Sequence, residues 1–528
     1  MFHASVDPFS IEAQGSFQVK AKIRKRLAAR RRRIEKRLRR KNFQIPTPVF
    51  AASNIEYEMS EKTQAISSGG IGVIHQTVKF LRLDTEINKH INLLKIHLPY
   101  TESDHVLNIA YNLIAGGTRL EHLDIRRYDE AWLNALGVQR IPDPTTAGDF
   151  CRRFDEQSIN DLMDVINDVR LNVWGLQSQP FLEHAIIEAD GTMVETGAES
   201  KQGIDINHKG VWGYHPLLIT LANTGEPLFV VNRSGNRPSH EGAHRYFDKA
   251  IQLCRKAGFR QVTLRGDTDF SQTAYLDGWN ADGVRFIFGM DATRKLYDLV
   301  ENLPATSFRK LTRPAPYEVK TKPRQRPENV KQSIVIDRNF EDIQLVQEWV
   351  AEFSYRPAAC ASDYRIIAVW KDLEIHKGQE KLFDDSRCFF YITNDFKSSA
   401  EEIVREANAR CNQENLIQQL KSGVNALVAP LNTLLSNWAY MVICSLAWSL
   451  KAWVALLMPV TPRWKEKHQN EKRRLLRMEF STFQNIFINI PAQIVRTGRE
   501  IVYRLLSWNP WLDAFFRYAD FIRRPLHG

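Results

Sequence analysis

The chain has 528 residues, 43% of them hydrophobic and 25% charged, a balance typical of a globular protein with several domains and ample core. Its six cysteines are far apart and form no CxxC pair, which argues against a zinc site and a disulfide framework and favours a reducing cytoplasm. The net charge of +11 is not spread evenly along the sequence.

Residues 1–45 are predicted to form a basic N-terminal arm. Between Lys20 and Lys41, 14 of 22 residues are Lys or Arg and one is acidic, so the rest of the protein is close to neutral. The segment is predicted to be a basic helix or disordered when free. Such charge suits the phosphate backbone of DNA, and a solubility or localisation tail is the alternative. The candidate DNA contacts are Arg30, Arg31, Arg32 and Arg33.

Residues 46–175 are predicted to be a helical DNA-binding region. Apolar residues recur at three-to-four spacing in HVLNIAYNLIAGG and DEAWLNALG, and glycines mark helix ends. A plain helical bundle gives the same periodicity, so that alternative stays open. The Gly-rich run Ser67–Val73 lacks the GK[ST] ending of a P-loop, and we assign it no nucleotide role.

Residues 176–295 change to the period of strands. HAIIEADGTMVET is a short apolar run, GYHPLLITLA and LFVVNRSG are strands joined by NTGEP, and His240–Gly258 is an amphipathic helix. FRQVTLRGDTDF and VRFIFGM add two more strands. Asp190 and Asp267 stand where the first and fourth strands end. This order predicts the first part of an RNase H-like α/β core, a mixed five-stranded sheet with helices.

Residues 296–385 are rich in Pro, Arg and short β-like runs, and they predict an inserted all-β domain. Basic and aromatic residues alternate there, among them Trp349, Arg365 and Trp370. Surfaces of this composition bind nucleic acid by charge and base stacking, while core packing is the alternative for any single aromatic residue.

Residues 386–460 are predicted to complete the core. After the strand CFFYITNDF, the run Glu401–Gly423 has no Pro and no internal Gly, which predicts one helix ending at Gly423. Arg410, Glu414 and Lys421 would then lie on one stripe of it. The simpler explanation of that stripe is a solvated helix face with an i,i+4 ion pair.

The apolar run Leu435–Val460 is the one candidate for a membrane segment. Asn437 and Lys451 interrupt it, so a buried core helix or helix pair is the preferred interpretation and we expect no membrane. Residues 461–528 are predicted to be a helical, basic C-terminal region.

Three acids are the candidate catalytic residues: Asp190, Asp267 and Glu414. Hard oxygen ligands without a Cys or His cluster suit Mg²⁺ or Mn²⁺, and two such ions support phosphoryl transfer. Asp190 would bridge both ions, and the other two acids would bind one each. Arg410 and Lys421 would grip the neighbouring phosphates. Taken singly, each acid is better explained as a turn residue or helix-face charge, so the hypothesis depends on the set.

These residues together resemble the DDE transposases of bacterial insertion sequences. The spacing of Arg410, Glu414 and Lys421 is similar to the branch with a Tyr–x2–Arg–x3–Glu–x6–Lys signature and a β domain before the final Glu, although Ala407 occupies the Tyr position. The resemblance also rests on IPDPTTAGDFCRRF, ADGT, TGEPL, NRSGN, HEGA, LRGDTDF and YITND, and it covers roughly residues 142–450.

The resemblance implies hydrolysis of double-stranded DNA at element ends, transfer of the 3′-OH ends to target DNA, dependence on Mg²⁺, and a homodimer in the DNA complex. It also implies a cytoplasmic, nucleoid-associated protein. Trp370 is the candidate for an aromatic residue that traps a flipped base. The alternatives are a catalytically inactive DNA-binding protein of transposase descent and an RNase H-type nuclease.

Overall fold

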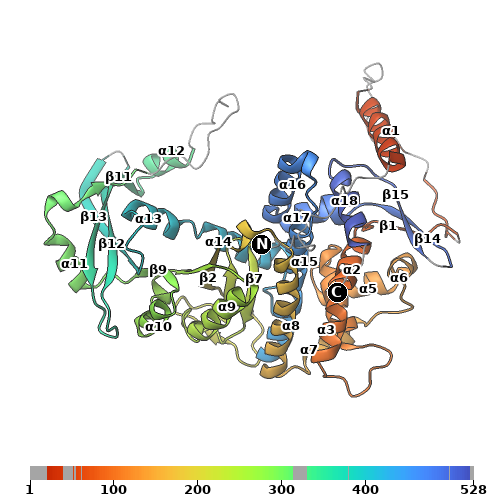
Figure 1. Cartoon of the computed structure of the whole chain (residues 1–528), viewed down its shortest axis with the longest axis horizontal. Helices are drawn as coiled ribbons and strands as arrows, with labels where there is room; N and C mark the ends of the chain where they lie inside the picture. The colour runs from red at the N-terminus through yellow and green to blue at the C-terminus, as the bar shows by residue number, and fades with distance from the viewer. Residues whose placement is uncertain are drawn as a thin grey trace, which may run out of the picture.

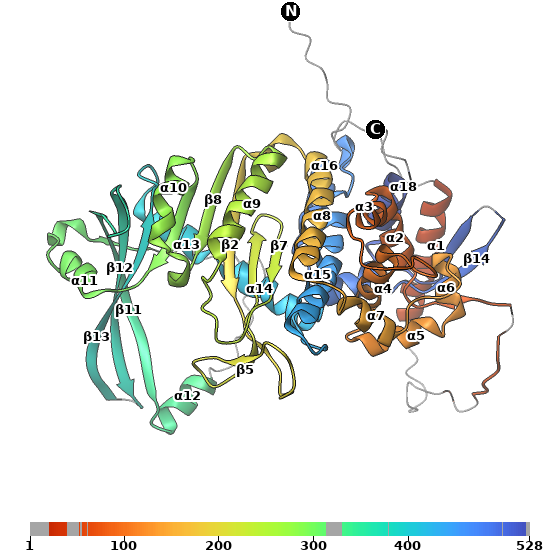
Figure 2. The ribbon, with the colours of Figure 1, turned by 90° about the horizontal axis from the view of Figure 1, so that it is seen from below.

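The computed structural model describes residues 21–39, 52, 55–60, 62–312, 330–378, 380–498 and 500–523. Figures 1 and 2 show the elements in a row: strands β11–β13 at one end, the rest of a large sheet next to them, and helices from both ends of the chain at the other end. The active-site candidates lie in the middle of this row.

The described part of the chain contains a mixed sheet of nine strands. Five of its strands have the order β9–β8–β2–β6–β7. Strand β2 pairs antiparallel with β6 and parallel with β8, β6 pairs antiparallel with β7, and β8 pairs parallel with β9. The predicted order of strands along the chain is confirmed. The five strands are His184–Gly191 (β2), Leu217–Leu221 (β6), Glu226–Val231 (β7), Gln261–Gly266 (β8) and Arg285–Met290 (β9).

Helices cover both faces of this sheet because its strands are apolar on both sides. On β9, Phe288 points toward helix α9 (Ala243–Ala257), where it contacts Phe247, while Ile287 points the other way into a cluster with Ile403 of helix α13 (Ala400–Asn408). The helix predicted before the fourth strand is therefore present as α9. A small separate sheet, ordered β3–β5–β4, lies between β2 and β6 in sequence. Its strands are Val194–Glu195 (β3), Asp205–Ile206 (β4) and Trp212–Tyr214 (β5).

Four further strands extend the same sheet. Strand β13 (Glu380–Thr393) pairs antiparallel with β9, and β12, β11 and β10 follow outward. Their bounds are Arg309–Lys310 (β10), Glu341–Tyr355 (β11) and Tyr364–Lys377 (β12).

The prediction of an all-β segment at residues 296–385 is wrong in one respect, because two helices contribute to it. They are α11 (Arg294–Glu301) and α12 (Val330–Asp337). The run RKLYDLVE has helical periodicity, with Leu296 and Val300 buried, and the stretch VKQSIVID is helical although its β-branched residues favour a strand. Residues 313–329 lie outside the described part.

Helix α15 (Leu434–Leu456) crosses the middle of the molecule. It is long and apolar enough to span a membrane, and its apolar window is wholly buried within the described fold, as expected of a core helix. It packs against α4 (Glu102–Ile114), α8 (Glu156–Gly175), β7 and α16 (Lys465–Arg477). A carboxylate joins three of these elements: Glu226 of β7 accepts from the Nε of Arg170 at 3.0 Å and from the indole of Trp453 at 2.8 Å.

The remaining helices of residues 46–175 surround α4 and α8, so this region is helical as predicted. Capping residues and glycines set their limits: Asp129 and Asp143 accept from backbone N–H groups of the first turns, and Gly137 closes a helix at φ 71°. The helices are Ile71–Phe80 (α2), Leu83–His90 (α3), Leu123–Arg127 (α5), Glu130–Leu136 (α6) and Pro144–Cys151 (α7).

The C-terminal region is not all helical, which corrects the prediction. A hairpin of β14 (Ala492–Arg496) and β15 (Ile501–Leu505) pairs with β1 (Ala65–Ile66) between the helices α17 (Phe480–Phe483) and α18 (Leu512–Ile522). The β-branched residues of AQIVR and IVYRL suit this hairpin. The Gly-rich run beside β1 has a packing role, because a Cβ on Gly70 would lie 1.8 Å from the carbonyl oxygen of Phe487.

Candidate active site

The two aspartates that end the predicted strands lie at the same edge of the sheet. Strands β2 and β8 are parallel neighbours, with Glu188 opposite Arg265, so Asp190 and Asp267 follow at matching positions. Asp267 begins a 3₁₀ turn, and its Oδ1 accepts from the backbone N–H of Asp269 at 3.0 Å. Adjacent parallel strands therefore deliver both carboxylates to one place, as the sequence predicted.

Arg410 lies between these carboxylates. Its Nη2 is 3.9 Å from Asp190 Oδ2 and 3.7 Å from Asp267 Oδ2. The Nε of the same guanidinium is buried and has no hydrogen-bond partner in the described part of the chain. One cation thus faces two acids and keeps a free donor.

Burial makes this place unfavourable for two bare negative charges. The pKa of Asp190 is raised to about 6: burial is the largest cause, Arg410 opposes the shift, and the neighbouring charges of Asp267 and Glu414 add to it. Burial also raises the pKa of Asp267, again opposed by Arg410. The two carboxylates therefore require positive charge to remain ionised together.

The donor set tests whether a divalent metal ion fits. Two carboxylates at one sheet edge, short of positive charge, suit a hard cation such as Mg²⁺ or Mn²⁺. In the described residues, however, no group of three or more Asp, Glu, His or Cys side chains is close enough to form a ready-made metal site. Asp190 and Asp267 fit the role of ligands, and Glu414 does not complete a cluster with them in this structure.

The helix expected from Glu401 to Gly423 is divided, which corrects the sequence analysis. Helix α13 ends at Asn408, α14 runs from Cys411 to Gln418, and a π-helical turn (η6) spans Gln419–Gly423. At the junction the N–H of Gln413 donates to the carbonyl of Arg410 at 2.8 Å, a bond between residues three apart. Figures 1 and 2 show α14 beside the end of β2. The single stripe calculated for a continuous helix does not apply.

Glu414 and Lys421 lie near the aspartates without direct contact in the described structure. Glu414 is exposed in the first turn of α14, close enough for its charge to raise the pKa of Asp190. Lys421 is half-buried in the π-helical turn; burial lowers its pKa and the charge of Asp190 opposes that change. The structure therefore brings all five residues to one region, with Arg410 in the closest contact.

Ala407 faces away from this region. It is buried in the apolar cluster that α13 forms with the sheet, together with Ile287 and Val350. The residue three before Arg410 is therefore part of the core, and no polar group is presented there.

Trp370 is hydrogen-bonded to a residue of its own strand and does not contact the aspartates in the described structure. It lies on β12 opposite Trp349, and both indoles donate to the carboxylate of Asp372, at 3.1 Å and 3.0 Å respectively. In the sheet order, β13 and β9 separate β12 from β8. Its assignment as a base trap stays a prediction.

The described part of the basic arm is a helix, α1 (Ala21–Leu38), which confirms the helical alternative; residues 1–20 and 40–45 of the arm lie outside the described residues. Arg30 Nη1 donates to the carbonyl of Leu505 at 2.6 Å, and the Arg31 guanidinium lies 5.6 Å from the ring centroid of Trp508. Arg32 and Arg33 are exposed.

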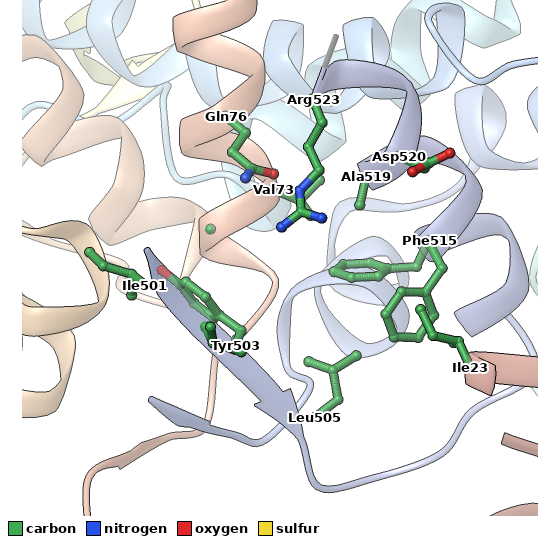
Figure 3. Close-up of a pocket in the computed structure, with 14 residues that line it drawn as sticks. Ile23, Val73, Gln76, Ile501, Tyr503, Leu505, Phe515, Ala519, Asp520 and Arg523 are labelled. Atoms are coloured by element: carbon green, nitrogen blue, oxygen red, sulfur yellow. The ribbon is translucent and has the colours of Figure 1, made fainter. Parts of the chain in front are cut away.

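A cavity of about 210 Å³ marks the place where the arm reaches the fold. Figure 3 shows Ile23 of α1, Phe515 of α18 and Leu505 of β15 among the residues that line it. The helix is therefore in contact with the C-terminal hairpin through Arg30, while Arg31 lies over Trp508 and also pairs with Glu35 of its own helix.

Sequence reasoning missed two charged residues beneath the aspartates. Glu188 and Arg265 are 1% and 3% exposed, and Arg265 Nε donates to Glu188 Oε1 at 2.7 Å. Each precedes a candidate aspartate by two residues inside an otherwise buried strand. A charged residue in the middle of an apolar strand was the feature of the sequence that could have identified them.

The sequence model of the family described as Transposase DDE domain group 1 matches residues 50–525. The chain belongs to this family. It is thus a DDE transposase by descent, and such transposases act in general as DNA endonucleases and strand transferases that use divalent metal ions.

A cryo-EM structure of the piggyBac transposase synaptic complex with hairpin DNA is similar at 10% identity, over 80% of this chain and 87% of that chain, with a TM-score of 0.33. No curated protein matches the chain.

Proposed function

We propose that this transposase cleaves double-stranded DNA at the terminal inverted repeats of a bacterial insertion sequence and joins the 3′-OH ends to target DNA. The observation that carries the proposal is the contact of Arg410 with Asp190 and Asp267 at adjacent strand ends. Paired carboxylates with a guanidinium beside them suit a reaction at a phosphodiester.

The strand order supports an RNase H-like core as the frame of this site. Three strands, β2, β6 and β7, form an antiparallel meander, and β8 and β9 add in parallel on the other side of β2. This matches the five-stranded arrangement expected from the sequence, with the acids at the ends of the first and fourth strands. The four outer strands then continue from β9.

Each residue of the site has a proposed task. Asp190 and Asp267 would hold Mg²⁺ or Mn²⁺, with Glu414 as the third ligand once α14 meets DNA, and two bound ions would supply activation of the attacking oxygen and stabilisation of the leaving oxygen. Arg410 and Lys421 would bind the phosphates beside the scissile bond. Water first cleaves the strand to leave a 3′-OH, and that hydroxyl then attacks a target phosphodiester and displaces its 3′ oxygen.

The exposed face of α1 is the proposed contact with the DNA backbone away from the site. Exposed guanidinium groups at Arg32 and Arg33 are free for phosphates there. We also propose a homodimer in the DNA complex and a cytoplasmic, nucleoid-associated protein, following the family resemblance.

The test is cleavage and strand transfer on a DNA fragment carrying the inverted repeat, with Mg²⁺. Asp190→Ala, Asp267→Ala and Glu414→Ala should each reduce both steps by at least about 1,000-fold, because each removes a proposed metal ligand. Asp269→Ala is the matched control: it removes an exposed carboxylate two residues from Asp267 and should retain activity.

Retained activity in all three alanine variants would refute the catalytic assignment. Wild-type protein that binds the ends but stays inert with Mg²⁺ and Mn²⁺ would favour a DNA-binding protein of transposase descent. Cleavage of RNA–DNA hybrids without end specificity would favour an RNase H-type nuclease.

A further inference from the structure

The buried ion pair beneath the aspartates makes a second contact that the proposed reaction does not explain. Arg265 Nη2 lies 2.5 Å from Glu188 Oε1, and Arg265 Nη1 donates to the backbone carbonyl of Glu406 at 2.6 Å. Glu406 belongs to the last turn of α13. A strand of the sheet thus holds the C-terminal end of the helix that leads to Arg410.

That carbonyl lies where the helix stops. The N–H of Ala409 is shared between the carbonyl of Arg405 at 3.1 Å, four residues before it, and the carbonyl of Glu406 at 3.2 Å, three residues before it, and the backbone of Ala409 has ψ near zero, at 5°. The last carbonyls of a helix lack partners within the helix, and a cationic side chain satisfies them well. Arg265 therefore stabilises the helix end at this particular turn.

The side chain of Glu406 is held from the neighbouring strand. Arg285 of β9 donates to both carboxylate oxygens of Glu406 at 2.7 Å, and its Nε donates to Asp395 at 2.8 Å. Two arginines from adjacent strands thus fix one residue through its carbonyl and its carboxylate. Four residues later, Arg410 reaches the two aspartates.

The stability of the fold does not explain the buried pair of Glu188 and Arg265, whereas the bond from Arg265 to the carbonyl of Glu406 does. Glu188 and Arg265 lose their hydration inside the sheet, and apolar residues of similar volume would stabilise such a position at least as well. An apolar residue in place of Arg265 could not donate a hydrogen bond to the carbonyl of Glu406. Glu188 supplies the negative charge that neutralises the buried Arg265 guanidinium.

We propose that Arg265, neutralised by Glu188, is a positioning residue: it caps α13 at Glu406, fixes the helix break at residues 409–410, and so aims Arg410 at the phosphate and the aspartates. The inference rests on the proposed function, since Arg410 has its task there. It assigns no contact with DNA to Arg265 itself.

The main variant is the double substitution Glu188→Gln with Arg265→Met, which removes both buried charges and the cap while keeping side-chain volume. Strand transfer should fall roughly 10- to 100-fold, the size of effect expected from a displaced phosphate-binding group. The same double substitution added to Arg410→Ala should cause little further loss, because Arg265 acts through Arg410. Lys256→Met, which removes an exposed charge from α9, serves as the control.

A second measurement does not depend on activity. Hydrogen exchange of the backbone amides at residues 409–413 should accelerate at least tenfold in the double variant, with unchanged exchange in β6 and β7. Arg265→Lys keeps a cation for Glu188 but lacks the second N–H group that donates to the carbonyl of Glu406. This variant should therefore also accelerate hydrogen exchange at residues 409–413. This variant also guards against misfolding of the double variant.

The outcomes separate the two proposals. An inert wild-type protein would refute the proposed function, while exchange at residues 409–413 would still report on the cap. Unchanged exchange in both Arg265 variants, or a loss of strand transfer that multiplies with that of Arg410→Ala, would overturn the positioning role.

Discussion

At the scale of single residues, Arg410 has two effects that a substitution should separate. Its guanidinium supplies positive charge to Asp190 and Asp267, so it competes with any other cation there. Arg410→Gln should therefore raise the affinity of the DNA-free protein for Mn²⁺ by about tenfold or more. The same variant should lower strand transfer about 100-fold, because it removes a donor to the phosphate. Mn²⁺ affinity is measured by electron paramagnetic resonance.

The Mn²⁺ affinity of Arg410→Gln also depends on pH, because protons compete with the metal for Asp190. Removing Arg410 also raises the pKa of Asp190 above about 6, because Arg410 lowers it in the intact protein, so protons compete with the metal more strongly in the variant. Measurement at pH 8, above the pKa of Asp190 in the intact protein, reduces this competition by protons. Arg405→Gln removes an exposed arginine from α13, the helix that precedes Arg410, and should change neither quantity. Weaker Mn²⁺ binding by Arg410→Gln would contradict the competition.

At the scale of elements, the contact of α15 with α16 contains a buried lysine. Lys451 is 1% exposed; its Nζ donates to the carbonyl of Leu476 at 3.0 Å and lies 3.8 Å from the ring centroid of Trp448. Burial lowers its pKa to about 7. Between pH 7 and the unfolded-state pKa near ~10.4, the unfolded chain holds a proton that the folded chain has released, so the free energy of unfolding rises with pH.

Lys451→Met should remove this dependence. The variant should be more stable than the wild type at pH 7 and below, by about 2 to 4 kcal/mol, and the gain should disappear as the pH approaches ~10.4. Urea unfolding followed by tryptophan fluorescence at pH values from 6 to 10 measures both curves. Lys256→Met, whose charge is exposed, should give a curve parallel to the wild type. Parallel curves for Lys451→Met would show that the lysine remains charged when folded.

The elements also show what sequence could and could not predict. Period-two apolar runs that stop at Asp190 and Asp267 were sufficient to place both acids at strand ends, and parallel pairing then brought them together. The break before Cys411 was not predictable from helix propensity, because contacts from another strand, through Arg265, hold the preceding turn. The C-terminal hairpin was missed since its strands have only 5 residues each, and β1 pairs with it from far away in sequence.

At the scale of the whole molecule, the basic helix and the aspartates lie in different parts. Figures 1 and 2 show α1 at the helical end with the C-terminal hairpin, while Asp190 and Asp267 end strands in the central sheet. Under the proposed function, DNA bound by both α1 and the site would pass along the intervening helices. The arm should therefore contribute to affinity through its exposed charges and leave the chemistry of the bound end to the sheet.

Two double substitutions among Arg30–Arg33 test whether the arm contributes affinity for DNA and the sheet contributes the chemistry. Arg32→Gln with Arg33→Gln should lower the slope of log affinity against log salt by about 2, because two phosphate contacts are lost, with little change in cleavage at saturating DNA. Arg30→Gln with Arg31→Gln removes the same charge but also the contacts with Leu505 and Trp508, so α1 should additionally become sensitive to trypsin. Fluorescence anisotropy at several salt concentrations measures the slope. Equal slopes in the wild type and in Arg32→Gln with Arg33→Gln would show that these two arginines do not bind phosphate. Unchanged trypsin sensitivity in Arg30→Gln with Arg31→Gln would show that Arg30 and Arg31 do not attach the helix.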